Sequence, residues 1–254
     1  MSVSTKGSKK GSNLPSRRFV VDESIFDSFP GMQIVVATVT KMNNSGNNDA
    51  SREWLESAWT ATHKLSEEYP NPQSVPRIGL WRTALRDAGI NPKKYPVSIE
   101  AMVRRTFKTS APLVINPLTD LIHSVSLDHL VPVGGFDLGR LRGDFRLART
   151  RGEETFRELG TEGDAIQVEA DEIAYLDDEG VQTRQFVWRQ AGASLIVEDT
   201  TDAVIVAEVL AEVGSDVAEQ VSDDLKDRIE TVLERPVDAA VLDGRKLSCE
   251  LPAR

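Results

Sequence analysis

The spacing of apolar residues changes once along this chain, and that change most constrains its fold. Between residues 50 and 130, apolar side chains recur at helical intervals. From residue 144 to residue 210, short β-branched segments alternate with polar or glycine-containing turns. A helix-rich half followed by a strand-rich half is typical of α+β proteins. We therefore expect an α+β fold.

The periodicity also predicts the individual elements. Gly89 stands where a glycine ends a helix, and Ser98 stands where a serine caps the next one. VPVGGFD, at 131–137, is expected to be a loop, and Asp243-Gly244 a hairpin turn. Helices are predicted over 51–69, 76–88, 99–108 and 117–128, with a strongly acidic helix over 216–234. Strands are predicted over 32–41 and at DFRLAR, EIAYLD, RQFVWR, SLIV and AVIVAEVL.

The ends of the chain differ in character. Residues 1–18 are rich in Ser, Gly and Lys, which predicts a disordered basic tail, and residues 19–254 are expected to form a single domain. With 254 residues, of which 40% are hydrophobic, the chain can bury a core without cross-links. The single cysteine, Cys249, excludes an intramolecular disulfide and favours the cytoplasm. No apolar run reaches the roughly 18 residues of a membrane span.

Charge is distributed unevenly over a chain whose formal net charge is −10. Residues 76–108 carry eight basic side chains and two acidic ones, whereas residues 197–235 carry three basic and twelve acidic ones. A locally basic face can bind phosphate groups despite an acidic total. The alternative is that these charges lie on ordinary solvated helix faces. The candidate phosphate-binding residues are Arg82, Lys93, Lys94, Arg104 and Arg105.

Standard catalytic motifs are absent, so candidate site residues come from local patterns. Asp120 and His123 are three residues apart on a predicted helix, a spacing that suits either a general base or a surface pair. Gly134-Gly135 marks either a turn or a close backbone approach to a ligand. Trp188-Arg189-Gln190 suits the rim of a pocket. Four Cys and His side chains, far apart in sequence, predict no zinc site, and no other cofactor is implied.

Three segments carry a resemblance to a known family. They are NPKKYPVSIEAMVRR at 91–105, a long run from 116 to 156 that includes VPVGGFDLGRLRGDF, and 171–206 with its EDTTDAVIV. Together they resemble the B3/B4 domain of the bacterial phenylalanyl-tRNA synthetase beta subunit. They are more similar still to free-standing B3/B4 tRNA-binding domain proteins.

The resemblance implies an α+β fold in which helices pack on a mixed or antiparallel sheet. It also implies a cleft that hydrolyses an amino acid wrongly esterified to tRNA, a reaction that needs a held water and an oxyanion stabiliser. Asp137 and Thr200 fall in register with residues of the synthetase pattern. Other positions depart from it: the loop histidine falls on Gly134, and the glutamate that senses a tyrosine hydroxyl falls on Val206, two residues before Glu208.

Three functional hypotheses follow. The first is a stand-alone hydrolase of aminoacyl-tRNA, with Asp120, His123 and Thr200 in catalysis and tRNA as the partner. Its substrate would contact Gly134, Gly135, Asp137, Trp188, Arg189, Gln190 and Glu208, and the five cations above would steer the tRNA. The second is a non-catalytic RNA-binding module. The third is a protein that binds a free amino acid or another small metabolite on the same fold.

Overall fold

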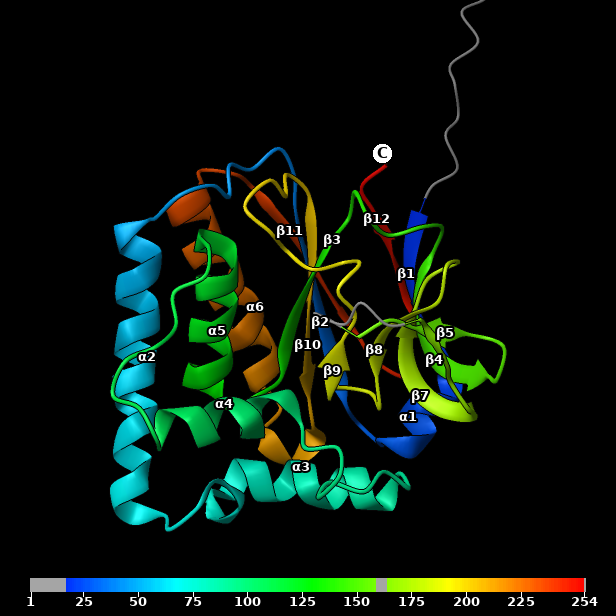
Figure 1. The fold of residues 1–254 in the computed structure, drawn as a ribbon, viewed down its shortest axis with the longest axis horizontal. Coiled ribbons are helices and arrows are strands. Elements are labelled where there is room, and N and C mark those ends of the chain that lie inside the picture. Colours follow the sequence, from blue (N-terminus) through cyan, green and yellow to red (C-terminus); the bar gives the residue numbers. More distant parts are fainter. Residues whose placement is uncertain (1–16, 159–163, 254) are drawn as a thin grey trace, which may run out of the picture.

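The computed structural model describes residues 17–158 and 164–253, which are arranged in layers (Figure 1). Two helices, α5 (Pro117–His129) and α6 (Val217–Leu233), cover one face of a four-stranded sheet. A third, α2 (Asp49–Glu68), packs on α5 further out. A six-stranded sheet lies against the opposite face of the four-stranded one. The predicted α+β class is confirmed.

The four-stranded sheet is antiparallel throughout. Its order is β11 (Val237–Leu242), β2 (Gln33–Val39), β10 (Ala203–Val209) and β3 (Val133–Asp137). All seven residues of β10 are buried, as are six of the seven in β2. Both strands are covered on two faces, which explains why their sequences are nearly continuous apolar runs rather than alternating ones.

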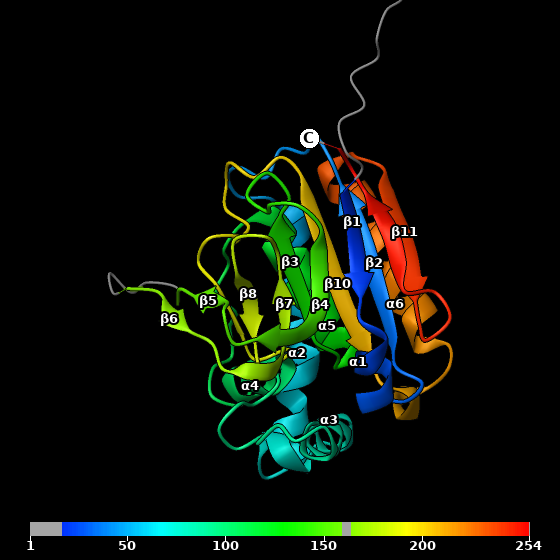
Figure 2. The same cartoon turned by 90° about the vertical axis from the view of Figure 1, so that its right-hand side faces the viewer.

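The six-stranded sheet joins both ends of the chain (Figure 2). Its first strand, β1, is parallel to β4 and antiparallel to β12, and its far edge is the two-residue strand β9. The order is β12 (Ser248–Leu251), β1 (Arg17–Val21), β4 (Phe145–Arg151), β7 (Ala170–Leu176), β8 (Val181–Arg184) and β9 (Arg189–Gln190). A small ribbon is made by β5 (Thr155–Phe156) and β6 (Ile166–Gln167).

Aromatic rings fill the space between the two sheets. The ring of Phe145 lies 4.7 Å from that of Phe136 and 5.4 Å from that of Tyr175, centroid to centroid. This packing fixes Tyr175 at one end of the core. That end is closed by α3 (Pro76–Asp87) and α4 (Ser98–Thr106), which lie at the bottom of Figure 1. Shorter pieces are α1 (Glu23–Ser28), η1 (Pro72–Ser74) and η2 (Ala211–Val213).

Several predicted elements are wrong in type. VPVGGFD contains strand β3, because its backbone pairs with β10. RQFVWR is not one strand: residues 185–188 form a turn between β8 and β9, and SLIV is not a strand. Ser98 is the first residue of α4 and does not cap it; Val97 holds the cap position. The predicted helices α2, α3, α4, α5 and α6 and the strands β2, β4, β7 and β10 are confirmed.

The tail prediction extends too far by two residues, since Arg17 and Arg18 begin β1. The rest of that predicted tail lies outside the described residues. One buried apolar cluster contains side chains from Phe19 through Leu251. We therefore propose that residues 17–253 form one domain. In the described part of the chain, none of the helices combines the length and apolar character that a bilayer crossing requires.

Candidate functional site

A cavity of about 240 Å³ lies where the edges of the two sheets meet α4 and α5. β3 is the edge of the four-stranded sheet and β9 the edge of the six-stranded one. The Gln190 Nε2 atom bridges them by donating to the Gly135 carbonyl over 2.9 Å. The lining includes seven of the predicted site residues: Arg105, His123, Gly134, Trp188, Arg189, Gln190 and Glu208. It also includes Ser98, Met102, Phe136, Tyr175, Thr183, Phe186 and Val206.

Glu208 supplies a buried carboxyl to this cavity. It stands on β10, only 2% exposed, and the Tyr175 hydroxyl donates a hydrogen bond to its Oε1 atom. Burial raises the pKa of Glu208 to about 7, against the opposing effect of that hydrogen bond. Burial and the neighbouring carboxylate raise the pKa of Tyr175 well above its usual value, so the tyrosine remains a donor. Glu208 therefore exchanges a proton near neutral pH.

His123 enters the cavity from α5 with its ring half-buried. Burial, with a smaller contribution from the positive charge of Arg105, lowers the pKa of His123 to about 4. The imidazole is therefore neutral at pH 7, with one nitrogen that donates and one that accepts. It can hold a water molecule or a polar ligand group without carrying charge.

The two glycines of β3 have different roles. Neither lies at positive φ, so the turn alternative for this pair is wrong. Gly134 is opposite Val206 in a pair whose backbone groups bond across to β10. The backbone groups of Gly135 point the other way, as its carbonyl contact with Gln190 shows. Of the two amides, only that of Gly135 points away from β10, and Gly135 itself is not among the residues that line the cavity.

Substitution by alanine is expected to lower stability at Gly135 and to leave it unchanged at Gly134. A Cβ at Gly135 would lie 2.4 Å from Ile196 Cδ1 and 2.7 Å from Ile122 Cδ1, so Gly135→Ala should lower the free energy of unfolding by about 1–3 kcal/mol. A Cβ at Gly134 meets its nearest atom, on Phe136, at 3.7 Å. Gly134→Ala should therefore fold normally and place its methyl group at the cavity wall. Urea unfolding of both variants tests this, and equal stability of the two would contradict it.

A hairpin tip positions the cavity wall next to β9. Gln185 and Phe186 have φ values of 48° and 65°, which are unfavourable for residues other than glycine. Glu172 accepts hydrogen bonds from the Gln185 backbone N–H at 2.9 Å and from its side-chain amide at 2.7 Å, and Phe186 is fully buried. These contacts hold the strained tip and set the direction of Trp188, which follows it.

The rim of the cavity is cationic. Arg105 is exposed on α4, and the Arg189 guanidinium lies 4.6 Å above the Trp188 ring while also pairing with Glu158. Both arginines belong to the cavity lining. The site therefore has a buried carboxyl inside and two guanidinium groups at its opening. The positive charge at the opening favours the binding of anionic groups there.

Asp120 does not orient His123, contrary to expectation. Its side chain is 1% exposed, and its Oδ1 atom accepts from the Ile115 backbone N–H over 2.9 Å. It lies outside the cavity lining. Asp120 therefore fixes the chain entering α5, and the helical spacing that suggested a catalytic pair reflects this local role.

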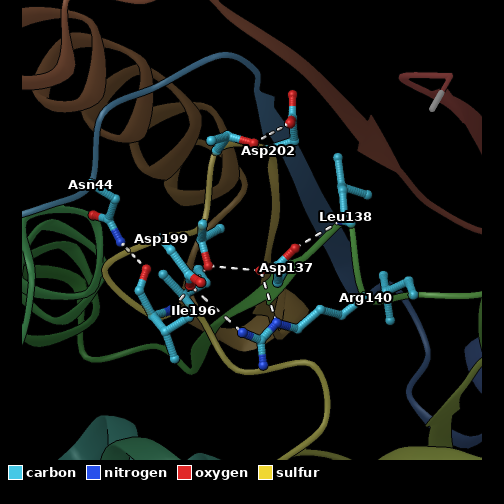
Figure 3. Close-up of polar contacts among 12 residues, drawn as sticks. Asn44, Asp137, Leu138, Arg140, Ile196, Asp199 and Asp202 are labelled. Carbon is cyan, nitrogen blue, oxygen red and sulfur yellow. Dashed lines mark hydrogen bonds and ion pairs between the residues drawn. The ribbon is translucent and has the colours of Figure 1, made fainter.

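Asp137 and Thr200 also lie outside the cavity lining. Figure 3 shows the loop contacts around Asp137. The Thr200 hydroxyl donates to Asp137 Oδ2 over 2.8 Å, and the Val197 N–H donates to that hydroxyl over 3.0 Å. The Arg140 guanidinium lies 3.3 Å from Asp137 and 3.6 Å from Asp199. These bonds tie the loop before β10 to the end of β3. The predicted catalytic role of Thr200 is therefore not supported by its position.

The predicted phosphate-binding cations divide into two groups. Arg82 and Arg104 both pair with Glu100, which is fully buried, at 2.9 Å and 3.0 Å. Because these two guanidinium groups neutralise an internal carboxylate, they are less available to RNA, and their predicted contact with RNA stays a prediction. Lys93 and Lys94 are exposed on the turn before α4, and Arg105 is at the cavity.

Three polar lining residues, Ser98, Tyr175 and Thr183, were missed from the sequence. Tyr175 lies in the apolar second half of β7, and the buried hydroxyl of Thr183 has no hydrogen-bond partner among the described residues. A tyrosine in a buried strand needs a partner for its hydroxyl. Glu208, the one acid in AVIVAEVL, is that partner, and its isolation among apolar residues is the signal that could have revealed the pair. Within residues 17–158 and 164–253, no three His, Cys, Asp or Glu side chains converge as metal ligands.

Comparison with known proteins gives one family. A family model described as "B3/4 domain" matches residues 80–243. No curated protein matches the chain. The crystal structure of an N-terminal fragment of the phenylalanyl-tRNA synthetase beta-subunit from Pyrococcus horikoshii is similar, at 12% identity and a TM-score of 0.49. The similarity covers 98% of this chain and 57% of that fragment, so the chain spans just over half of its length. Since the family model matches well over half of the sequence, the chain belongs to the B3/4 domain family.

Proposed function

We propose that this protein hydrolyses the ester of an aminoacyl-tRNA, acting in trans to remove a wrongly attached amino acid. The observation that carries the proposal is the composition of one cavity. A carboxyl that titrates near pH 7 and a neutral imidazole lie inside it, and two arginines lie at its opening. The proposal includes a cytosolic location, since a single cysteine suits a reducing compartment.

The reaction needs few groups. Glu208, when ionised, takes a proton from a water molecule as the water oxygen attacks the ester carbonyl. The carbonyl oxygen gains negative charge, and we assign its stabilisation to the Gly135 amide, which points away from β10 between the lining residue Gly134 and the Gln190 side chain. The ester C–O bond then breaks, and the proton held on Glu208 passes to the ribose oxygen that leaves. A base whose pKa lies near the working pH suits this role. His123 holds the water or the amino group by a neutral hydrogen bond.

The size of the cavity limits what enters it. Pockets for drug-sized ligands enclose roughly 300–1,000 Å³, and this one encloses about 240 Å³. It therefore accommodates a group the size of one amino acid, with the nucleic acid outside. The cationic rim is on the side that such a substrate's phosphates would approach.

A free amino acid or another small metabolite is the second candidate. The same cavity size favours it, as does the use of Arg82 and Arg104 in internal pairing, which leaves fewer cations for RNA. This candidate predicts that an amino acid raises the melting temperature in a concentration-dependent way, and that no tRNA ester is cleaved.

Deacylation of a panel of correctly and wrongly charged tRNAs tests the proposal. We expect one mischarged species to lose its ester, at a rate that rises with pH until Glu208 is ionised and is constant above about pH 8. Glu208→Gln should reduce that rate by about 10²–10⁴-fold, and His123→Ala should reduce it without unfolding the protein. Trp54→Leu, on the exposed side of α2, is the matched control and should react like wild type. No ester loss from any species would remove the proposal.

A further inference from the structure

Three consecutive contacts connect four residues from two segments that are far apart in sequence. Lys94 Nζ lies 4.9 Å above the ring of Tyr95. The Tyr95 and Trp188 rings meet edge to face, 4.8 Å between centroids and 67° between planes. The Arg189 guanidinium covers Trp188 at 4.6 Å. We call this cation–ring–ring–cation set of Lys94, Tyr95, Trp188 and Arg189 the aromatic row.

The aromatic row lies at the opening of the cavity. Trp188 and Arg189 are part of the lining, whereas Lys94 and Tyr95 belong to the turn that leads into α4. Both rings are half-buried, and both cations are exposed. The row therefore presents aromatic surface and positive charge on one accessible ledge, outside the volume in which the reaction is proposed to occur.

A second basic hollow continues from this row. It is lined by Arg82, Arg86 and Lys93 together with residues 89–92. Lys93 precedes Lys94 directly, so the hollow adjoins the row through the chain itself. Arg86 and Lys93 are exposed, whereas Arg82 is engaged by Glu100. An anionic polymer leaving the cavity at Trp188 thus meets further cations along this direction.

We infer that the aromatic row binds the unpaired terminal nucleotides of an RNA strand whose end enters the cavity. Rings interleaved with cations are the chemistry by which proteins hold single-stranded nucleic acid, since bases stack on rings and phosphates pair with cations. The inference rests on the proposed function only in taking that RNA to be a tRNA. Tyr95, for which the sequence predicted no role, is the residue it adds to the site.

Binding must compete with an ion pair already present. Glu158 pairs with Arg189, so a phosphate has to share or displace that carboxylate. We therefore expect modest affinity that falls steeply as salt is raised. The alternative is that the row only packs the hairpin against the turn. Substitutions in the row would then lower the stability of the protein and leave its affinity for RNA unchanged.

Fluorescence anisotropy with a short labelled single-stranded RNA tests the inference. Tyr95→Leu and Trp188→Leu should each weaken binding by about 5- to 150-fold, the range for loss of one base–ring stack. Lys94→Glu, which changes only an exposed side chain, should weaken it without altering the melting temperature. Trp54→Leu is the control, because Trp54 carries the Arg228 guanidinium 4.3 Å from its ring on a different face. It should bind like wild type.

The outcomes separate this inference from the proposed function. Unchanged RNA binding in Tyr95→Leu and Lys94→Glu would overturn the aromatic row whether or not any ester is hydrolysed. Wild-type RNA binding by Glu208→Gln is expected, because Glu208 lies inside the cavity. RNA binding that depends on Tyr95, found together with a complete lack of deacylation, would support the row and remove the hydrolase. A Tyr95→Leu protein with unaltered KM for charged tRNA would count against the row alone.

Discussion

Glu208→Gln is expected to make the folded protein more stable at pH 8 by up to about 3 kcal/mol. Burial raises the pKa of Glu208 from 4.5 to about 7, and each unit corresponds to about 1.4 kcal/mol. Between these two values the folded protein keeps a proton that the unfolded chain has lost. Stability therefore falls as pH rises through this window and is constant above it. Glutamine has no proton to lose, and its side-chain oxygen still accepts from Tyr175.

Urea unfolding of wild type and Glu208→Gln at pH 5 and pH 8 measures the effect. The difference between the two proteins should be small at pH 5 and largest at pH 8. Glu100→Gln provides the contrast, because Glu100 is equally buried and is paired with two arginines. It should be less stable than wild type at both pH values. Equal stability of Glu208→Gln and wild type at pH 8 would show that Glu208 ionises without cost.

Arg82→Met is expected to destabilise the protein by about 3 kcal/mol or more. The Arg82 Nη1 atom lies 3.0 Å and 2.9 Å from the two oxygens of Glu100, and Gln73 donates to the same carboxylate over 2.8 Å. Removing one partner of a buried ion pair costs about 3–5 kcal/mol, because the other charge remains in a low-dielectric environment. Arg104, whose side chain is 42% exposed, compensates only in part.

A double variant distinguishes charge from packing at this position. Arg82→Met combined with Glu100→Leu should recover most of the lost stability, since an apolar pair of similar volume replaces the ion pair. Single-stranded RNA binding should be close to wild type in the double variant. A large loss of RNA binding in this protein would identify Arg82 as a phosphate ligand.

The pattern of apolar residues was informative where burial of an element determines its sequence. The helical spacing of Trp54, Leu55, Ala58 and Trp59 corresponds to α2, and the apolar runs correspond to β2 and β10. It failed at β3, where two glycines suggested a loop although the strand is held by backbone pairing with β10. It failed also at residues 185–188, where the local sequence favours a strand but contacts with Glu172 and the buried Phe186 impose a tip.

The residues of the candidate site were predicted only in part from the sequence. The resemblance brought together residues that line one cavity, from α5, β3, β9 and β10. Spacing alone could not show that Asp120 bonds to Ile115, or that Thr200 bonds to Asp137, because each partner is fixed by tertiary packing. Nor does any local pattern show that Tyr95 meets Trp188, since their segments join only when the hairpin folds onto the turn.

The positions of β1 and β2 have a consequence for biosynthesis. Each early strand sits between two later ones: β1 pairs with β4 and β12, and β2 pairs with β10 and β11. Contacts between residues so distant in sequence slow folding and raise contact order. On the ribosome, one edge of β2 stays unpaired until β11, which begins at Val237, has emerged. One edge of β1 stays unpaired until β12, which begins at Ser248, has emerged. A fragment trimmed to the family match at 80–243 would lack a central strand of each sheet.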